Sequence, residues 1–282
     1  MRFPLKDVTV KRVRRVKQVT SPLYADSFWQ MNQDEFAMQV EGVGTFYARD
    51  GNEVEYSPVP GASRESLELY LNGSVYGAIL HQRKILPLHG SSFLYEGKGI
   101  MLCGEAGAGK SSLTASFCLD GAEFLTDDVT PIIFNGSSPY IWAMSDRIKL
   151  WSDTVKQLKM DSEVMKRINP GTDKYYYTIN GAEGETFRLS LIFILRSADM
   201  VSVACKEVNG SNKFEALRNE IYRFEYLNGM PENNAVYFRN IIDVSSSVKV
   251  YEIKRPGRIQ VLDLKMFLEE NLTRDNSLQD VL

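Results

Sequence analysis

A glycine-rich segment at residues 104–111 has the composition and spacing that phosphate binding requires. It reads Gly-Glu-Ala-Gly-Ala-Gly-Lys-Ser and matches the pattern G-x-x-x-x-G-K-[ST]. Small residues let backbone N–H groups surround a phosphate, and the following helix directs its positive end toward the same anion. In this pattern Lys110 reaches the β- and γ-phosphates, and the Ser111 hydroxyl binds Mg²⁺. We therefore expect a nucleoside triphosphate and Mg²⁺ to bind at these residues: Gly104, Glu105, Ala106, Gly107, Ala108, Gly109, Lys110, Ser111 and Ser112.

Two adjacent carboxylates, Asp127 and Asp128, follow the lysine by only seventeen residues. They come directly after a predicted strand at 122–126, and ligands of parallel α/β sheets bind at such strand ends. Neighbouring side chains point in different directions, so one carboxylate can hold Mg²⁺ while the other accepts the proton of a hydroxyl group. An ordinary acidic turn is the alternative, and the short distance from the lysine favours the catalytic interpretation.

The chain contains two histidines, and one of them precedes the glycine-rich loop. A hairpin at 91–100 would place His89 beside the strand that leads into the loop, where an imidazole could contact a phosphate or a carboxylate. A purely structural histidine is the alternative. The other, His81, follows a predicted helix and is expected only to interact with the dipole of that helix.

Basic residues supply weaker candidates. Arg147, Lys149 and Lys174 could stabilise the charge that develops on a transferring phosphoryl group, or they could be ordinary surface charges. The segment at residues 2–17 holds seven basic residues and one acid. It is either a solvated arm or a docking site for an acidic peptide.

The elements around these residues follow two patterns, which predict two domains. Residues 1–84 indicate a small α+β domain with strands at 36–40 and 44–48 and a helix from Ser63. From residue 85 to 282, apolar strands alternate with helices, which indicates an α/β domain. Its expected strands are 98–103, 122–126, 191–195 and 249–253, and its expected helices are 110–119, 212–227 and 258–272.

Together, these motifs resemble the catalytic domain of the bacterial HPr kinase family and its serine-kinase relatives. The resemblance rests on Leu88-His89-Gly90, the loop GEAGAGKSS and the segment Phe124–Val129. It implies a P-loop kinase fold of the type shared with phosphoenolpyruvate carboxykinase. It also implies that Asp127 is the base for a serine hydroxyl, that Ser111 and Asp128 bind Mg²⁺, and that His89 and Lys110 take part in catalysis.

One departure from the family narrows the expected substrate. Residues 179–185 do not match the EIRGLGI signature of the bifunctional members, which argues against phosphorylase activity and against recognition of the HPr carrier. Relatives without that signature include kinases that phosphorylate a serine near the C-terminus of lasso-peptide precursors. We expect an ATP-dependent serine kinase acting on a peptide or protein, with a lasso-type precursor as the leading case. The alternatives are a kinase of a small-molecule alcohol and a nucleotide-binding regulatory NTPase acting through a partner.

The amino-acid composition restricts the classes of partner and the compartment that we expect. The chain has 282 residues, 44% of them hydrophobic and 24% charged, and a net charge of −3. Such a small charge does not indicate a nucleic-acid or membrane partner. Three scattered cysteines indicate a reducing compartment and no structural metal. Without a signal peptide or an apolar stretch of about 18 residues, the protein is expected to be soluble and cytoplasmic. Because enzymes of the family often assemble, we also expect that it can form homo-oligomers.

Overall fold

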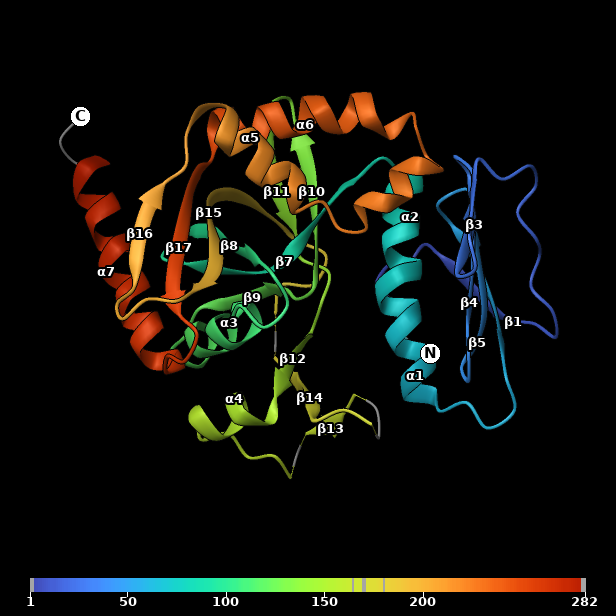
Figure 1. Ribbon diagram of the computed structural model, residues 1–282, viewed down its shortest axis with the longest axis horizontal. Coiled ribbons are helices and arrows are strands. Elements are labelled where there is room, and N and C mark those ends of the chain that lie inside the picture. The colour runs from blue at the N-terminus through green and yellow to red at the C-terminus, as the bar shows by residue number, and fades with distance from the viewer. Residues whose placement is uncertain (1–2, 164, 169–170, 180, 280–282) are drawn as a thin grey trace.

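A mostly antiparallel N-terminal sheet forms one end of the molecule in the computed structural model, which describes residues 3–279 except 164, 169, 170 and 180 (Figure 1). The strand order is β1-β6-β5-β4-β3-β2, and only β1 and β6 run parallel. The strands predicted at 36–40 and 44–48 are both present. The bounds are β1 Thr9–Arg12, β2 Tyr24–Ala25, β3 Trp29–Met31, β4 Glu35–Val40, β5 Gly44–Arg49 and β6 Glu53–Pro58.

The predicted helix after Ser63 lies between this sheet and the rest of the chain (Figure 1). The Ser63 side chain accepts a hydrogen bond from the backbone N–H of Ser66 and caps the helix. The helix runs through α1 (Arg64–Tyr70), a wide π turn, η1 (Leu71–Val75), and α2 (Tyr76–Gln82).

One apolar face of this helix builds the core of the N-terminal part. It comprises Leu67, Leu71, Val75 and Ile79, each at most 4% exposed. The same core takes Tyr226 and Met230 from far along the chain. The domain division at residue 84 stays a prediction, since one core contains side chains from both sides of it.

The second sheet is mixed, with the order β11-β10-β7-β8-β15-β17-β16 and β9 also paired with β7. Strand β15 runs parallel to β8 and β17, and the other pairings are antiparallel. The predicted strands at 98–103, 122–126, 191–195 and 249–253 all form. The bounds are β7 Leu86–Tyr95, β8 Lys98–Gly104, β9 Glu123–Thr126, β10 Val129–Asn135, β11 Ser138–Trp142, β15 Thr186–Ala198, β16 Ala204–Glu207 and β17 Lys249–Pro256.

Helices cover both faces of this sheet. On one face, α3 (Lys110–Leu119) and α7 (Val261–Gln279) pack around Phe93, Ile100 and Leu102. On the other, α5 (Gly210–Asn219) and α6 (Asn233–Ser247) pack through a separate apolar cluster. The fold is therefore mixed α/β. None of the helices in the described part of the chain combines the length and the apolarity needed to cross a bilayer.

The structure corrects three expectations about this larger part. The predicted alternation of strands and helices does not hold throughout, because β9, β10, β11 and β12 (Arg147–Trp151) follow one another without a helix. The predicted helix at 212–227 ends at Asn219, and a short 3₁₀ helix, η2 (Phe224–Asn228), follows. The predicted helix at 258–272 begins later, at Val261.

A small third sheet lies beside the main one. Its strand order is β12-β14-β13, and α4 follows β12 directly. Strand β12 matters most, because it contacts α3, and its Lys149 backbone N–H donates to the same carboxylate, Asp127, as Ser111 at the start of α3. The remaining bounds are β13 Lys166–Arg167, β14 Lys174–Thr178 and α4 Ser152–Gln157.

His81 is wholly buried, which contradicts its expected role as a cationic partner of the helix dipole. Its Nε2–H donates to the carbonyl of Tyr222 at 2.8 Å, and its Nδ1 lies 3.2 Å from the Tyr237 hydroxyl. Burial lowers the pKa of His81 to about 4. The imidazole is therefore neutral at pH 7 and joins α2 to two distant segments.

Acidification is expected to weaken the fold through this residue. The unfolded chain binds a proton near pH 6.5, whereas the folded chain resists it until about pH 4. His81 thus stabilises the fold fully above pH 6.5, and this contribution is lost as the pH falls toward 4. In denaturant titrations, the stability advantage of wild type over His81→Gln should shrink by roughly 3 kcal/mol between pH 7 and pH 4. Parallel pH profiles would contradict this.

Candidate active site

The glycine-rich loop joins β8 to α3, so the strand and helix that a phosphate loop requires are both present. Gly104 has φ +126°, and a Cβ there would lie 2.3 Å from the Leu195 carbonyl oxygen. Gly109, with φ +103°, is the residue before the first turn of α3. Only glycine fits these two positions without strain. The local sequence therefore fixes the loop against β15 and directs the start of α3 toward it.

Lys110 lies within this loop. Its Nζ donates to the carbonyl oxygens of Gly104 at 2.6 Å and Glu105 at 3.1 Å. The side chain is nearly buried, and that burial lowers its pKa. A phosphate in the loop would offer this ammonium a charged partner in place of two neutral carbonyls.

The two aspartates interrupt a strand. Both β9 and β10 pair with the same edge of β7, through Ser92 with Thr126 and His89 with Val129. Asp127 and Asp128 lie between these pairings. Asp128 has φ +73°, which is uncommon for a residue other than glycine and is a kind of strain that often marks functional sites. The interruption allows both carboxylates to reach partners outside the sheet.

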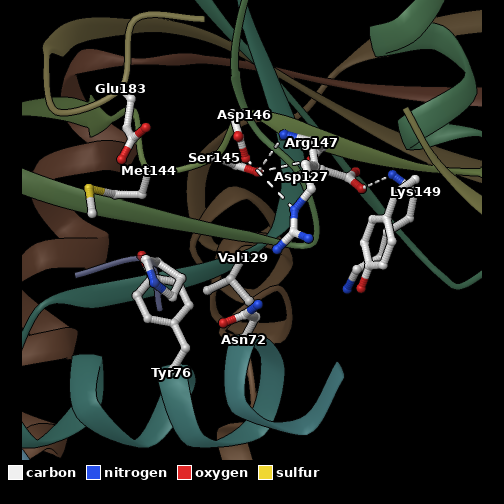
Figure 2. A pocket seen from close by; sticks show the side chains of 12 residues that line it. Asn72, Tyr76, Asp127, Val129, Met144, Ser145, Asp146, Arg147, Lys149 and Glu183 are labelled. Carbon is white, nitrogen blue, oxygen red and sulfur yellow. Dashed lines mark hydrogen bonds and ion pairs between the residues drawn. The ribbon is translucent and has the colours of Figure 1, made fainter. Parts of the chain in front are cut away.

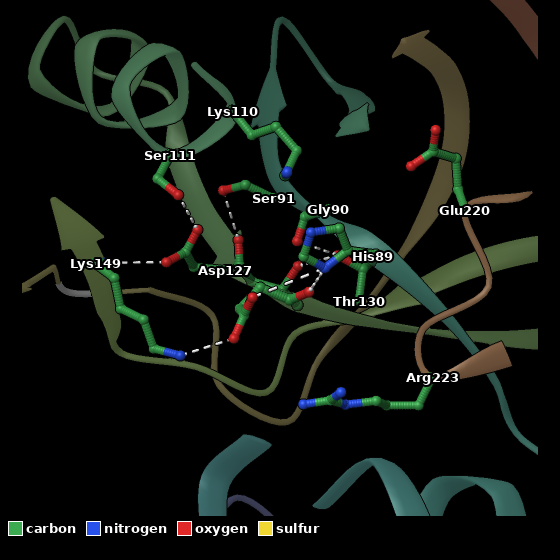
Figure 3. Close-up of polar contacts among 12 residues, drawn as sticks. His89, Gly90, Ser91, Lys110, Ser111, Asp127, Thr130, Lys149, Glu220 and Arg223 are labelled. Carbon is green, nitrogen blue, oxygen red and sulfur yellow. Dashed lines mark hydrogen bonds and ion pairs between the residues drawn. The ribbon is translucent and has the colours of Figure 1, made fainter. Parts of the chain in front are cut away.

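Their partners make the two carboxylates chemically different (Figure 3). Asp127 accepts from Ser111 Oγ at 2.7 Å and from the Lys149 backbone N–H at 2.8 Å. Burial, and then the nearby charge of Asp128, raise the pKa of Asp127. Asp128 accepts from Lys149 Nζ at 2.8 Å, and this ammonium holds the pKa of Asp128 well below its usual range. Asp127 thus binds a proton more readily, whereas Asp128 remains ionised.

His89 lies on the opposite side of Asp128 from Lys149. Its Nδ1–H donates to the Asp128 carbonyl oxygen at 3.1 Å, and its ring stacks on Tyr222 with centroids 5.8 Å apart. Burial, with a further contribution from Lys110, lowers the pKa of His89. The structure therefore brings together the sequence-predicted residues His89, Lys110, Ser111, Asp127 and Asp128.

Alternate side chains of strand β12 face the site. Its residues alternate, with Ile148 and Leu150 buried and with Arg147, Lys149 and Trp151 on the more exposed face. Lys149 contacts both aspartates and proves central, although its sequence signal was weak. Burial alone would lower the pKa of Lys149, but Asp128 raises it above its usual range.

The other two weak candidates, Arg147 and Lys174, each contact an aromatic ring. Arg147 stacks on Tyr176 at 4.7 Å, lies 3.9 Å from Glu68 and lines a neighbouring cavity with Asp127 (Figure 2). That cavity holds about 60 Å³, enough for a few water molecules but not for a substrate. Lys174 lies over the Trp151 ring at 4.4 Å.

The segment from Glu220 to Arg223 lies beside the loop, and the sequence did not predict it as part of the site. Buried Glu220 accepts from the Gly104 backbone N–H at 3.1 Å and from the Arg196 guanidinium at 3.1 Å. With Arg223, these residues line an open cleft of about 670 Å³ that reaches His89 and Asp128. No local signal marks this segment, because apolar residues continue at helical spacing through it.

The donor atoms fit Mg²⁺. Hydroxyl and carboxylate oxygens from Ser111, Asp127 and Asp128 are hard ligands, which this ion prefers. The described residues contain no group of three or more His, Cys, Asp or Glu side chains placed to hold a metal. Proteins commonly bind Mg²⁺ through one or two carboxylates together with the phosphates of the substrate.

No family model matches this chain, and no curated protein matches it. Among solved structures, it is similar to the Hpr(Ser) kinase/phosphatase from Coxiella burnetii, with 12% sequence identity and a TM-score of 0.37. The superposition covers 69% of this chain and 95% of that chain.

Proposed function

We propose that this protein is an ATP-dependent kinase that transfers the γ-phosphoryl group to the serine hydroxyl of a peptide or protein. The observation that carries the proposal is the hydrogen bond between Ser111 Oγ and Asp127 Oδ1. It joins the end of the phosphate loop to a carboxylate whose pKa is raised. A protein that only binds nucleotide has no need of a proton acceptor at that point. The motif resemblance to the HPr kinase family supports the same reaction.

Each residue of the site has a separate role in phosphoryl transfer. The backbone N–H groups of the loop and Lys110 hold the triphosphate. Ser111 and Asp128 would hold Mg²⁺, which would supply positive charge to balance that of the phosphates. Asp127 accepts the proton of the serine hydroxyl while the serine oxygen forms its bond to the γ-phosphorus. The bond from that phosphorus to the bridging oxygen breaks, and ADP leaves.

Electrostatics support Asp127 rather than Asp128 as the base. A carboxylate whose pKa lies closer to neutral accepts a proton more effectively than one whose pKa is depressed. Lys149 separates the two, since its ammonium contacts Asp128 while only its backbone N–H contacts Asp127. Asp128 therefore keeps the charge that a cation requires.

The open cleft beside His89 and Asp128 is the proposed entry of the acceptor. It begins at Gly104 and Glu105, where the γ-phosphate end of the loop lies, and continues past Arg196 to Arg223 and Glu225. A groove of that size with charged walls suits an extended polar peptide better than a small alcohol. A lasso-type precursor peptide stays a prediction, which a precursor encoded beside this gene would support.

A coupled assay of ADP formation tests the proposal. We expect serine-containing peptides to stimulate ADP formation and to acquire one phosphate per ADP released. Matched peptides with alanine in place of serine should do neither, because they lack the accepting hydroxyl. ADP formation that no serine peptide stimulates would instead favour a nucleotide-hydrolysing switch. Peptides drawn from neighbouring genes are the first to test.

A further inference from the structure

We propose that the nucleoside of the phosphate donor binds in a groove on the other side of the loop, with its base against Trp151 and its phosphates near Arg255. The inference rests on the proposed function, since it takes the loop to hold a triphosphate. It adds the subsite that distinguishes a nucleotide from inorganic polyphosphate.

The direction of the phosphate chain points to this groove. Lys110 reaches the β- and γ-phosphates in such loops. Asp127, the residue proposed to accept the serine proton, lies at the γ-phosphate end. The α-phosphate must therefore leave the loop on its other side. There a groove of about 870 Å³ begins at Gly107, Gly109 and Ser112. Its size is typical of small-molecule sites.

Trp151 offers a flat surface in this groove. It is 48% exposed, although large aromatic side chains are usually well covered. It stands two residues beyond Lys149 on β12, about 7 Å farther along the strand. Lys174 lies over the ring at 4.4 Å, yet Trp151 still lines the groove.

Apolar side chains form other parts of the groove wall. Val203, Ile259 and Leu264 line it together with Trp151. A planar base between an aromatic ring and aliphatic groups gains stacking and burial without the need for a specific hydrogen bond. The groove therefore suits a nucleotide with an aromatic base.

Arg255 supplies positive charge at the same place. It is only 7% exposed, and it donates to the carbonyl oxygens of Ala108 at 2.8 Å, Gly107 at 2.9 Å, Pro256 at 2.8 Å and Gly257 at 3.3 Å. Among the described residues, these carbonyls are its partners, and no carboxylate forms an ion pair with it. A buried cation without a counterion is unfavourable. Phosphate groups of a nucleotide would balance it.

Calorimetric titration with two probes tests the subsite. Magnesium ADP carries the base, whereas magnesium pyrophosphate engages the loop alone. Trp151→Ala is expected to weaken ADP binding by roughly tenfold, the size of a lost base–aromatic stack, and to leave pyrophosphate binding unchanged. Trp151→Phe should retain most of the ADP affinity. Phe238→Ala removes an exposed ring on α6, outside the groove, and should bind both probes like wild type.

The outcomes separate this inference from the proposed function. If Trp151→Ala binds ADP as tightly as wild type, or weakens both probes equally, the nucleoside subsite is overturned while the phosphate loop stands. If wild type binds neither probe, the phosphate-loop assignment fails, and the subsite fails with it.

Discussion

Asp127→Asn is expected to slow phosphoryl transfer by about 10³-fold, in line with the loss of a general base. Asparagine keeps the shape of the side chain, and its amide oxygen can still accept from Ser111 Oγ. It cannot take up the proton of the incoming hydroxyl. ATP affinity should change by no more than a few-fold, because the loop and Lys110 are untouched. Single-turnover transfer to a serine peptide, with ATP affinity measured separately, checks both parts.

Asp128→Asn is the matched control. It leaves the proposed base in place but breaks the ion pair with Lys149. We expect a smaller loss of transfer and a higher Mg²⁺ requirement. If Asp128→Asn is the more damaging substitution and Asp127→Asn retains transfer, the two roles are the reverse of those proposed.

Lys110→Ala is expected to abolish nucleotide binding at millimolar ATP. The ammonium is the one lysine charge inside the loop, and alanine cannot reach the phosphates. Wild type at about 100 times its dissociation constant should gain roughly 5–10 °C in thermal midpoint from ATP and Mg²⁺. The variant should gain nothing.

Lys206→Ala provides the comparison, since Lys206 is exposed on β16 away from the loop. It should be protected like wild type. Full protection of Lys110→Ala by ATP would contradict the assignment of residues 104–111 as a phosphate loop.

Much of the site could be predicted because its signals are local. The loop needs glycines where φ is positive, and the predicted β8 and α3 flank it. The aspartates follow a short strand as expected. The difference in their pKa values could not be predicted. It is caused by Lys149, which lies on β12 in another sheet and is distant from the aspartates in sequence.

The segment around Glu220 shows where local patterns fail. Apolar spacing predicts that the helix continues to residue 227, yet it ends at Asn219. There the chain pairs with the free edge of β7. Leu88 forms a bridge with Ile221, and the His89 and Tyr222 backbone N–H groups donate to the carbonyls of Glu220 and Pro87. These long-range hydrogen bonds replace helical ones. No residue type in the segment indicates that the helix ends there.

The run of strands after Glu123 is a different case, because its signal was present in the sequence. Gly136-Ser137 is a two-residue hairpin turn that begins with glycine, and Gly136 has φ +61°. It connects β10 to β11, which pair antiparallel. This turn signal is local, so the hairpin could be predicted from the sequence, although simple alternation of strands and helices leaves no place for it.

The most direct test is a ³¹P NMR time course of ATP, Mg²⁺ and a serine peptide with the wild-type protein. The γ-phosphate signal is expected to decline as a phosphoserine signal of equal intensity appears with that of ADP, and Asp127→Asn should show neither change on the same timescale. Inorganic phosphate as the sole product with every serine peptide, or equal rates for the two proteins, would contradict a site that activates a serine hydroxyl.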